Sequence, residues 1–279
     1  MASKAVLITG CSTGIGRKTA EHLADRGWAV YATARRPESI ADLGGKGCKT
    51  LALDVTDESS MASAVRTVEE AEGAIGVLIN NAGYSQSGAV EEVPMEQVRR
   101  QFETNVFGLL RMCQLVLPGM RRQGYGKIVN ISSMGGRVVF PGGGIYHGTK
   151  FAVEAISDAM RWEVRNFGVD VILIEPGLIR TEFGDTAAHT VDEATSPDGP
   201  YAEFNQLVAR TTTGAYEGRG AVGPELVAKR IERAITSRRP GARYPITAGA
   251  RLLLGVRKIL PSRGWDALMR TQFKPPQRG

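Results

Sequence analysis

Residues 9–16 read TGCSTGIG, and this glycine-rich stretch joins the apolar run KAVLIT to a helical pattern. Its glycines permit a tight turn and a close approach of the backbone to a ligand. A helix that begins at such a turn offers free N–H groups to an anion. The spacing is G-x-x-x-G-x-G rather than G-x-G-x-x-G, but its place between strand and helix suits a dinucleotide pyrophosphate. The predicted contacts are Gly10, Ser12, Thr13, Gly14, Ile15 and Gly16.

Apolar strand-like runs and helical patterns alternate along the rest of the chain. The runs are KAVLIT, WAVYAT, KTLALDV, GVLINNAG, GKIVNIS and VDVILIEP, with RYPIT as a short seventh. Most are continuously apolar, as expected for parallel strands covered on both faces. Helical stretches are predicted near 15–26, 57–72, 94–122 and 145–167. This order predicts an α/β fold: a single Rossmann-type domain over residues 1–279, with a doubly wound parallel sheet of about seven strands and helices on both faces.

Two segments depart from the alternation. Residues 178–223 are rich in Gly, Thr, Asp and Pro, and they are too long for an ordinary connection. We expect them to form a substrate loop or lid. A C-terminal extension, residues 249–279, opens with GARLLLGVRKIL, which is predicted to form an amphipathic helix that covers the pocket. A role at a membrane surface is the weaker alternative.

Composition places the chain among ordinary soluble proteins, with 42% apolar and 23% charged residues. Cys11, Cys48 and Cys113 form no paired or metal-binding spacing, which favours reduced thiols. The stretch MASKAVLITG lacks the apolar core of a signal peptide, and no apolar run approaches the length of a membrane span. A cytoplasmic protein without stable membrane insertion is expected.

The charge is uneven, but it does not indicate nucleic-acid binding. Of 35 basic residues, 15 lie in residues 206–279, beside only 4 of the 29 acidic ones. These basic residues are scattered through apolar helical patterns without interleaved aromatic residues, which favours a solvated face. His22, His147 and His189 have no metal-ligand spacing. Neither a nucleic-acid partner nor a metal site is predicted.

Arg35 and Arg36 follow the second predicted strand, in ATARR at residues 32–36. Dinucleotide folds that prefer NAD place an acidic residue near this strand end, whereas an arginine accommodates the 2′-phosphate of NADP. No carboxylate follows until Glu38. The segment therefore predicts that NADP(H) is preferred over NAD(H).

A hydrolase is an alternative interpretation of the same glycine-rich turn. Gly10-Cys-Ser-Thr-Gly14 also matches G-x-S-x-G, the nucleophile elbow of α/β-hydrolases. Asp185 and His189 would complete the order Ser12, Asp, His. However, the elbow would lie on the first strand, with no earlier loop to supply the second oxyanion donor. This interpretation also leaves Tyr146 and Lys150 without a purpose.

Four sequence features together resemble the short-chain dehydrogenase/reductase family: TGCSTGIG, NNAG at 80–83, Ser133, and Tyr146-x-x-x-Lys150. The resemblance spans Lys4 to Thr181. It implies that Asn105 is an active-site asparagine, that Asp54 contacts adenine, and that the Pro176-Gly177 segment closes over the nicotinamide. The usual Y-x-A-S-K is Y-H-G-T-K here. The resemblance adds these cofactor contacts: Val55, Asn81, Ala82, Gly83, Ile179 and Thr181.

An acid–base role for Tyr146 follows from the chemistry of carbonyl reduction. The pKa of a free tyrosine is about 10, too high for easy ionisation near neutrality. An ammonium one helical turn away, on Lys150, stabilises the phenolate. The resemblance implies that Lys150 also holds the nicotinamide ribose, that Ser133 polarises the carbonyl, and that Asn105 anchors a water that passes protons to Lys150.

The substrate side carries no motif. The expected pocket wall is mostly small or apolar, which favours a lipophilic ketone or alcohol, and it consists of Tyr84, Val139, Phe140, Gly143 and Phe183 beside Ser133 and Tyr146. TGCSTGIG and VYATARRP resemble most the branch that contains 17β-hydroxysteroid and retinol dehydrogenases, which points to steroid-like substrates. The family resemblance also implies a homodimer or homotetramer. The alternative from another class is a nucleotide-binding regulator that has lost turnover.

Overall fold

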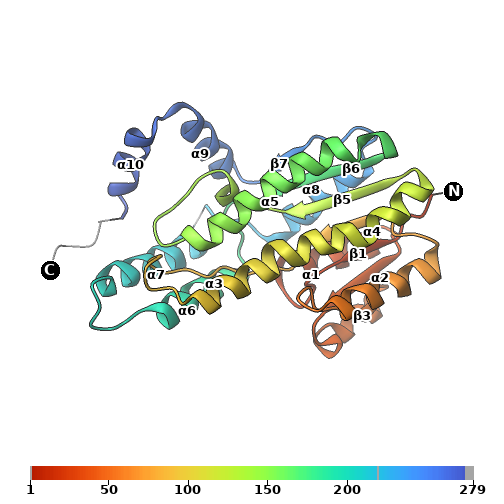
Figure 1. Ribbon diagram of the computed structural model, residues 1–279, viewed down its shortest axis with the longest axis horizontal. Coiled ribbons are helices and arrows are strands. Elements are labelled where there is room, and N and C mark those ends of the chain that lie inside the picture. The colour runs from red at the N-terminus through yellow and green to blue at the C-terminus, as the bar shows by residue number, and fades with distance from the viewer. Residues whose placement is uncertain (1, 219, 274–279) are drawn as a thin grey trace.

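The computed structural model describes residues 2–218 and 220–273. Within these residues a seven-stranded parallel sheet has the order β3-β2-β1-β4-β5-β6-β7 (Figure 1). The strands are β1 (Val6–Ile8), β2 (Val30–Ala34), β3 (Lys49–Ala52), β4 (Val77–Asn80), β5 (Gly126–Ile131), β6 (Val169–Glu175) and β7 (Arg243–Pro245). The strand order reverses between β1 and β4, where ligands bind in open α/β sheets. The predicted sheet is confirmed, and RYPIT contains its short edge strand.

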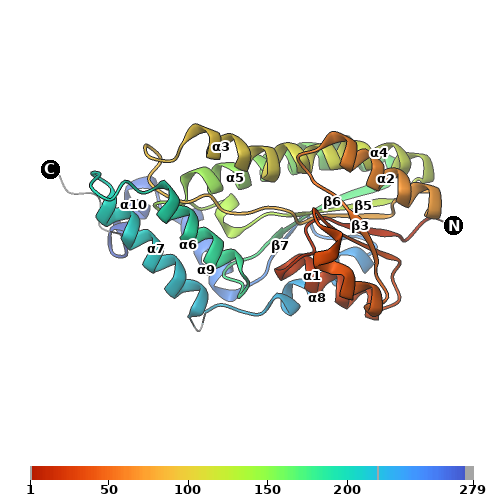
Figure 2. The same cartoon turned by 90° about the horizontal axis from the view of Figure 1, so that it is seen from below.

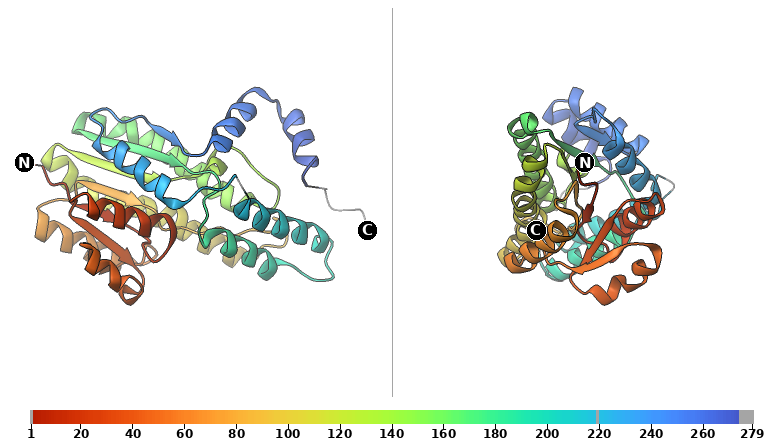
Figure 3. Two further views of the ribbon diagram at one scale, coloured as in Figure 1. Left: turned by 180° about the vertical axis from the view of Figure 1, so that it is seen from behind. Right: turned by 90° about the vertical axis from the view of Figure 1, so that its right-hand side faces the viewer.

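Helices cover both faces of the sheet, as predicted (Figure 2). On one face, α2 (Glu58–Glu72), α4 (Leu109–Gln123) and α5 (Gly144–Glu163) pack against β1, β4, β5 and β6. On the other, α1 (Gly14–Asp25) and α8 (Pro224–Thr236) lie side by side, as the view from behind shows (Figure 3). All three residues of β1 have no exposed surface, which accounts for the continuous apolar runs.

The predicted helix over 94–122 is interrupted at its centre. It consists of α3 (Met95–Phe102), a π-helical turn η2 (Glu103–Gly108) and α4. Such turns are rare in proteins, and those that occur often lie at functional sites. The turn contains Asn105, which is buried. Elsewhere, the described residues contain the 3₁₀ helices η1 (Pro37–Lys46), η3 (Met134–Gly136) and η4 (Arg165–Phe167).

Residues 178–223 contain more regular structure than their composition predicts. Two helices, α6 (Phe183–Ala194) and α7 (Ala202–Glu217), pack against each other beyond the carboxyl ends of the strands (Figure 1). Val191 of α6 and Val208 of α7 are buried in one small apolar cluster. The helices are held by this tertiary contact, which local composition does not reveal.

The C-terminal extension forms α9 (Ala248–Ile259) and α10 (Ser262–Arg270), so its predicted helix is present. Residues 274–279 of the extension lie outside the described residues. Leu254 of α9 and Trp265 and Met269 of α10 pack on Val138, in the segment that follows η3. Within residues 2–218 and 220–273, no helix combines the length and apolar character that crossing a bilayer requires.

Candidate functional site

A cavity of about 610 Å³ lies at the carboxyl ends of the strands and extends from the glycine-rich turn to α6 and α7. Its wall includes most of the predicted site residues. From the cofactor prediction they are Gly10, Ser12, Thr13, Gly14, Ile15, Arg35, Asp54, Val55, Asn81, Ala82, Gly83, Pro176, Gly177, Ile179 and Thr181, and from the catalytic prediction Ser133, Tyr146 and Lys150. Of the predicted cofactor and catalytic residues, three are not in the wall: Gly16, Arg36 and Asn105.

The glycine-rich turn lies close to the end of β4. Gly10 has a φ of 71°, and a Cβ there would lie 2.9 Å from Cα of Ala82. The side-chain amide of Asn81 donates to the carbonyls of Thr9 at 3.0 Å and Gly10 at 2.8 Å, which connects the two strand ends. Gly16 is buried beneath this contact, where a Cβ would overlap the Gly10 carbonyl. Its absence from the wall therefore reflects a packing role.

The geometry of this end fits a dinucleotide. The Thr13 side chain makes no cap hydrogen bond to α1, so the first N–H groups of that helix face the cavity without a side-chain acceptor. Further along the wall, Oδ1 of Asp54 accepts from the amide of Thr56 at 2.9 Å and from its hydroxyl at 2.7 Å. Arg35 and Asp54 both lie in the cavity wall, whereas Arg36 does not.

Asn105 lies behind the cavity wall and is bonded to the backbone. Its Oδ1 accepts from the amide of Tyr84 at 3.1 Å, and its Nδ2 donates to the Tyr84 carbonyl at 2.9 Å and to Oγ1 of Thr149 at 3.2 Å. A Cβ at Gly83 would meet Oδ1 of Asn105 at 3.0 Å and Nζ of Lys150 at 3.9 Å. The π-helical turn therefore brings Asn105 near Lys150, and Gly83, which has no side chain, lies between them.

Tyr146 and Lys150 project from the first two turns of α5. Nζ of Lys150 lies 5.8 Å from the centre of the Tyr146 ring and donates to the carbonyl of Ile131 at 2.8 Å. Burial raises the pKa of Tyr146 to about 12, and the Ser133 hydroxyl beside it acts in the opposite direction. Burial lowers the pKa of Lys150 to about 8, and the charge of Glu154 opposes this shift. Burial and the charge of Glu154 therefore act on the pKa of Lys150 in opposite directions.

An aromatic wall closes the other end of the cavity. The ring of Phe183 meets Tyr146 edge-on at 5.5 Å between centres, and Tyr216 of α7 lies 6.3 Å beyond Phe183. Phe183 and Tyr84 lie where the pocket wall was predicted. Residues missed by sequence reasoning are Ala34, Leu53, Thr56, Arg100, Thr104, Ile131, Ser132, Glu182, Thr186 and Tyr216. Leu53 and Thr56 flank a predicted contact, but Tyr216 lies in a segment that carries no motif.

Val139, Phe140 and Gly143 are not in the cavity wall, in contrast to the prediction. Phe140 packs against Trp265 and His147, at 6.3 Å and 5.8 Å between ring centres. The Val139 carbonyl accepts a hydrogen bond from the Trp265 indole at 3.2 Å. Contacts with Trp265 of α10 therefore hold Val139 and Phe140 away from the cavity. No described residue of α9 or α10 lines the cavity.

The histidines do not assemble a hydrolytic or metal site. His147 is buried, and its Nδ1 lies 3.0 Å from the Gly135 carbonyl. His189 is an exposed residue of α6 beside Glu193, and no hydrogen bond joins it to Ser12. Among the described residues, no group of three or more His, Cys, Asp or Glu side chains could hold a metal ion. The nucleophile elbow therefore lacks its base.

Comparison with known proteins agrees with this geometry. The family model of the short chain dehydrogenases matches residues 4–192. The chain belongs to the short-chain dehydrogenase family. A short-chain dehydrogenase structure from Streptomyces avermitilis is 34% identical, with a TM-score of 0.80 over 97% of this chain and 98% of the other.

Two further members of the family are similar to this short-chain dehydrogenase. The 3-ketodihydrosphingosine reductase of Bacteroides thetaiotaomicron is 41% identical over 73% of each chain. The closed form of a serine dehydrogenase, complexed with NADP⁺, is 26% identical, with a TM-score of 0.76 over 88% of this chain and 95% of the other.

Proposed function

We propose that this short-chain dehydrogenase interconverts a lipophilic ketone and its secondary alcohol, with NADP(H) as cofactor and Tyr146 as the acid and base. The observation that carries the proposal is the placement of Tyr146 and Lys150 in one cavity wall, 5.8 Å from ring centre to Nζ, beside the glycine-rich turn. The predicted roles of Asn105 and of the lid, residues 178–223, remain part of the proposal.

The residues of this chain would handle the proton. In reduction, the Tyr146 phenol donates its proton to the developing alkoxide, and in oxidation the phenolate takes it back. Burial raises the pKa of Tyr146. In the proposed mechanism the Lys150 ammonium stabilises the phenolate and so favours its ionisation. The Ser133 hydroxyl donates to the same substrate oxygen and polarises the carbonyl. The bound nicotinamide supplies or accepts the hydride.

A preference for NADP(H) is supported by Arg35. It lies in the cavity wall, and no carboxylate precedes Glu38 in the segment that follows β2. A guanidinium there would form a charge-assisted hydrogen bond with a 2′-phosphate. The similar serine dehydrogenase was seen with NADP⁺.

A lipophilic substrate is supported by the aromatic wall of Phe183 and Tyr216. The similar Bacteroides protein is named for reducing a ketone on a long-chain base, 3-ketodihydrosphingosine. Steroid-like ketones remain the proposal within the lipophilic class. The predicted homodimer or homotetramer would use the outer faces of α4 and α5, and Phe151 and Trp162 of α5 are exposed.

The test is a panel of acetophenone, cyclohexanone, ethyl acetoacetate and oestrone, each with NADPH and with NADH. Loss of the reduced nicotinamide absorbance band is measured, and light scattering in the same buffer gives the oligomeric state. We expect NADPH oxidation with the larger apolar ketones. Tight NADPH binding without oxidation by any ketone would instead favour the silent nucleotide-binding regulator.

A further inference from the structure

Two buried carboxylates lie directly behind the candidate active site. Glu154 is one turn after Lys150 on α5, and Glu175 ends β6, immediately before Pro176 of the cavity wall. The Glu175 side chain has no exposed surface, and that of Glu154 is 8% exposed. Carboxylates are rarely buried to this extent unless they are paired. Neither takes part in the chemistry proposed above.

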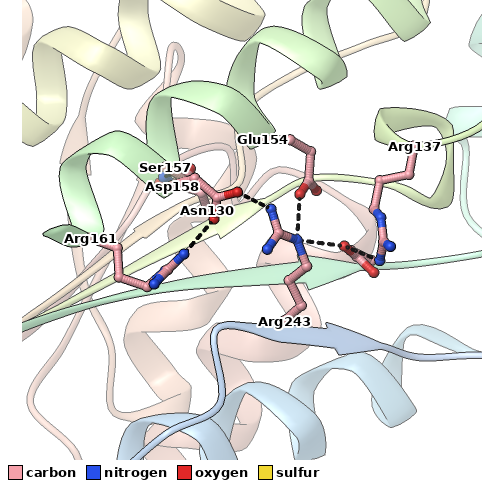
Figure 4. A network of polar contacts seen from close by, with 8 residues as sticks. Asn130, Arg137, Glu154, Ser157, Asp158, Arg161 and Arg243 are labelled. Atoms are coloured by element: carbon pink, nitrogen blue, oxygen red, sulfur yellow. Dashed lines mark hydrogen bonds and ion pairs between the residues drawn. The ribbon is translucent and has the colours of Figure 1, made fainter.

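One guanidinium serves both carboxylates. Nε of Arg243, from β7, lies 2.9 Å from Oε2 of Glu154 and 3.3 Å from Oε1 of Glu175 (Figure 4). Nη2 of Arg243 donates to Oδ2 of Asp158 at 2.7 Å, and Arg161 donates to Oδ1 of the same carboxylate at 2.9 Å. The second partner of Glu175 is the half-exposed Arg137, at 3.4 Å. Oε1 of Glu154 and Oε2 of Glu175 have no hydrogen-bond partner among the described residues.

The position of Glu154 links this cluster to the catalytic helix. A Cβ at Gly136 would lie 2.9 Å from Cγ of Glu154, 2.8 Å from Oγ of Ser132 and 3.1 Å from the carbonyl of Lys150. These three residues therefore converge on Gly136. The four-residue spacing also places Glu154 and Lys150 on the same side of α5. Burial lowers the pKa of Lys150, and the charge of Glu154 raises it.

We propose that Glu154 is a positioning residue whose carboxylate keeps the neighbouring Lys150 ammonium protonated, and that Arg243 keeps that carboxylate ionised. A buried lysine without such a partner loses its proton readily, and a neutral amine would not stabilise the Tyr146 phenolate. The groups that face Glu154 are Arg243 from β7, Glu175 from β6, Arg137 after η3, and Lys150 on its own helix.

Burial and the neighbouring polar groups shift the pKa of Glu154 in opposite directions. Burial raises the pKa of Glu154, and Ser132 and then Arg243 lower it. The pKa of Glu175 is also raised, first by burial and then by the charge of Glu154. Two carboxylates that share one guanidinium nitrogen compete for it, so Arg243 stabilises the ionised form of Glu154 more fully when Glu175 carries a proton.

Competitive labelling tests this role without any need for turnover. The full chain is acetylated with a trace of acetic anhydride over a range of pH, and peptide mass spectrometry gives the midpoint at which Lys150 becomes reactive. In Glu154→Gln we expect this midpoint to fall by about one pH unit, because the ammonium loses its counter-charge. Asp158→Asn is the matched control: it also removes a carboxylate from Arg243, but lies two turns from Lys150.

The expected pattern separates electrostatics from structure. Both variants lose a contact to Arg243, so both should melt at a lower temperature, whereas only Glu154→Gln should move the Lys150 midpoint. Glu154→Asp, which keeps the charge, should restore it. An unchanged midpoint in Glu154→Gln, or an equal shift in Asp158→Asn, would overturn the proposal. If Glu154→Gln does not fold, the apolar Glu154→Leu serves the same measurement.

The kinetic consequence rests on the proposed function. With the most reactive ketone of the panel, the alkaline limb of kcat/KM for reduction should shift to lower pH in Glu154→Gln, parallel to the labelling midpoint. A wild-type protein that turns over no ketone contradicts the proposed function but leaves the labelling result decisive for Glu154. If the labelling midpoint shifts but the pH profile of kcat/KM does not, the ionisation that controls the rate is not that of Lys150.

Discussion

Nζ of Lys150 lies 5.8 Å from the centre of the Tyr146 ring, one helical turn further along α5. The same atom donates to the Ile131 carbonyl at the end of β5, which anchors the amine against the sheet. Because this phenol and this amine lie in one cavity wall, we expect the ionisation of each to depend on the other.

Arg35 should determine the choice between the two nicotinamide cofactors. Arg35→Ala is expected to weaken NADPH binding by about 10- to 100-fold, because a charge-assisted hydrogen bond contributes about 1.5–3 kcal/mol, while NADH binding changes little. Fluorescence titration of both cofactors measures this. Arg36→Ala is the control, because Arg36 is not in the cavity wall and should leave both affinities unchanged. Equal losses for NADPH and NADH would argue against a contact with the 2′-phosphate.

Phe183 should contribute to substrate binding, whereas Phe140 should contribute to stability. Removing the ring that meets Tyr146 edge-on, in Phe183→Ala, should raise KM for oestrone by about tenfold, since an apolar contact contributes 1–3 kcal/mol. Phe140→Ala should lower the melting temperature and leave KM unchanged, because its ring packs on Trp265. A change in KM from Phe140→Ala alone would restore the pocket wall that the sequence predicted.

His147 should make the fold sensitive to acid. Burial lowers its pKa from the ordinary 6.5 to about 4, so the folded protein disfavours the charged imidazole. The contribution of the neutral imidazole to the free energy of unfolding is complete above pH 6.5. It is lost as the pH falls towards 4, and it amounts to about 3 kcal/mol in total.

The measurement for His147 is urea unfolding at several pH values between 7 and 4. In His147→Gln, whose amide can still donate to the Gly135 carbonyl, the free energy of unfolding should fall less steeply over this range. His189→Gln changes an exposed histidine and should follow the wild type. Identical pH dependence in all three proteins would exclude His147 as the acid-sensitive group.

The sheet and the dinucleotide end of the site were predictable because local sequence specifies them. Continuous apolar runs mark the buried strands, and the glycines at 10 and 14 mark a turn that needs positive φ, which both adopt. Tyr146 and Lys150 were predicted from their spacing on one helix, whereas Ser133 was assigned by the resemblance to the short-chain dehydrogenase/reductase family. The order of these elements then determines that they meet at one edge of the sheet.

The substrate end was not predictable because tertiary contacts form it. Tyr216 reaches the cavity only because α6 and α7 pack together, although their Thr- and Gly-rich sequences resemble a loop. Val139 and Phe140 precede the tyrosine closely in sequence, yet Trp265 draws them to the far side. The π-helical turn at Asn105 likewise depends on packing, where a Cβ at Gly108 would overlap the backbone of Val55.

The rate of ketone reduction by Tyr146→Phe is the most direct test of the proposed mechanism. The substitution removes only the phenolic oxygen, so NADPH binding and the melting temperature should stay near those of the wild type. With the ketone that the wild type reduces fastest, we expect NADPH oxidation to fall by at least about a hundredfold, the lower end of typical contributions from general acid catalysis. A Tyr146→Phe variant that binds NADPH normally and keeps the wild-type rate would contradict the assignment of Tyr146 as the proton donor.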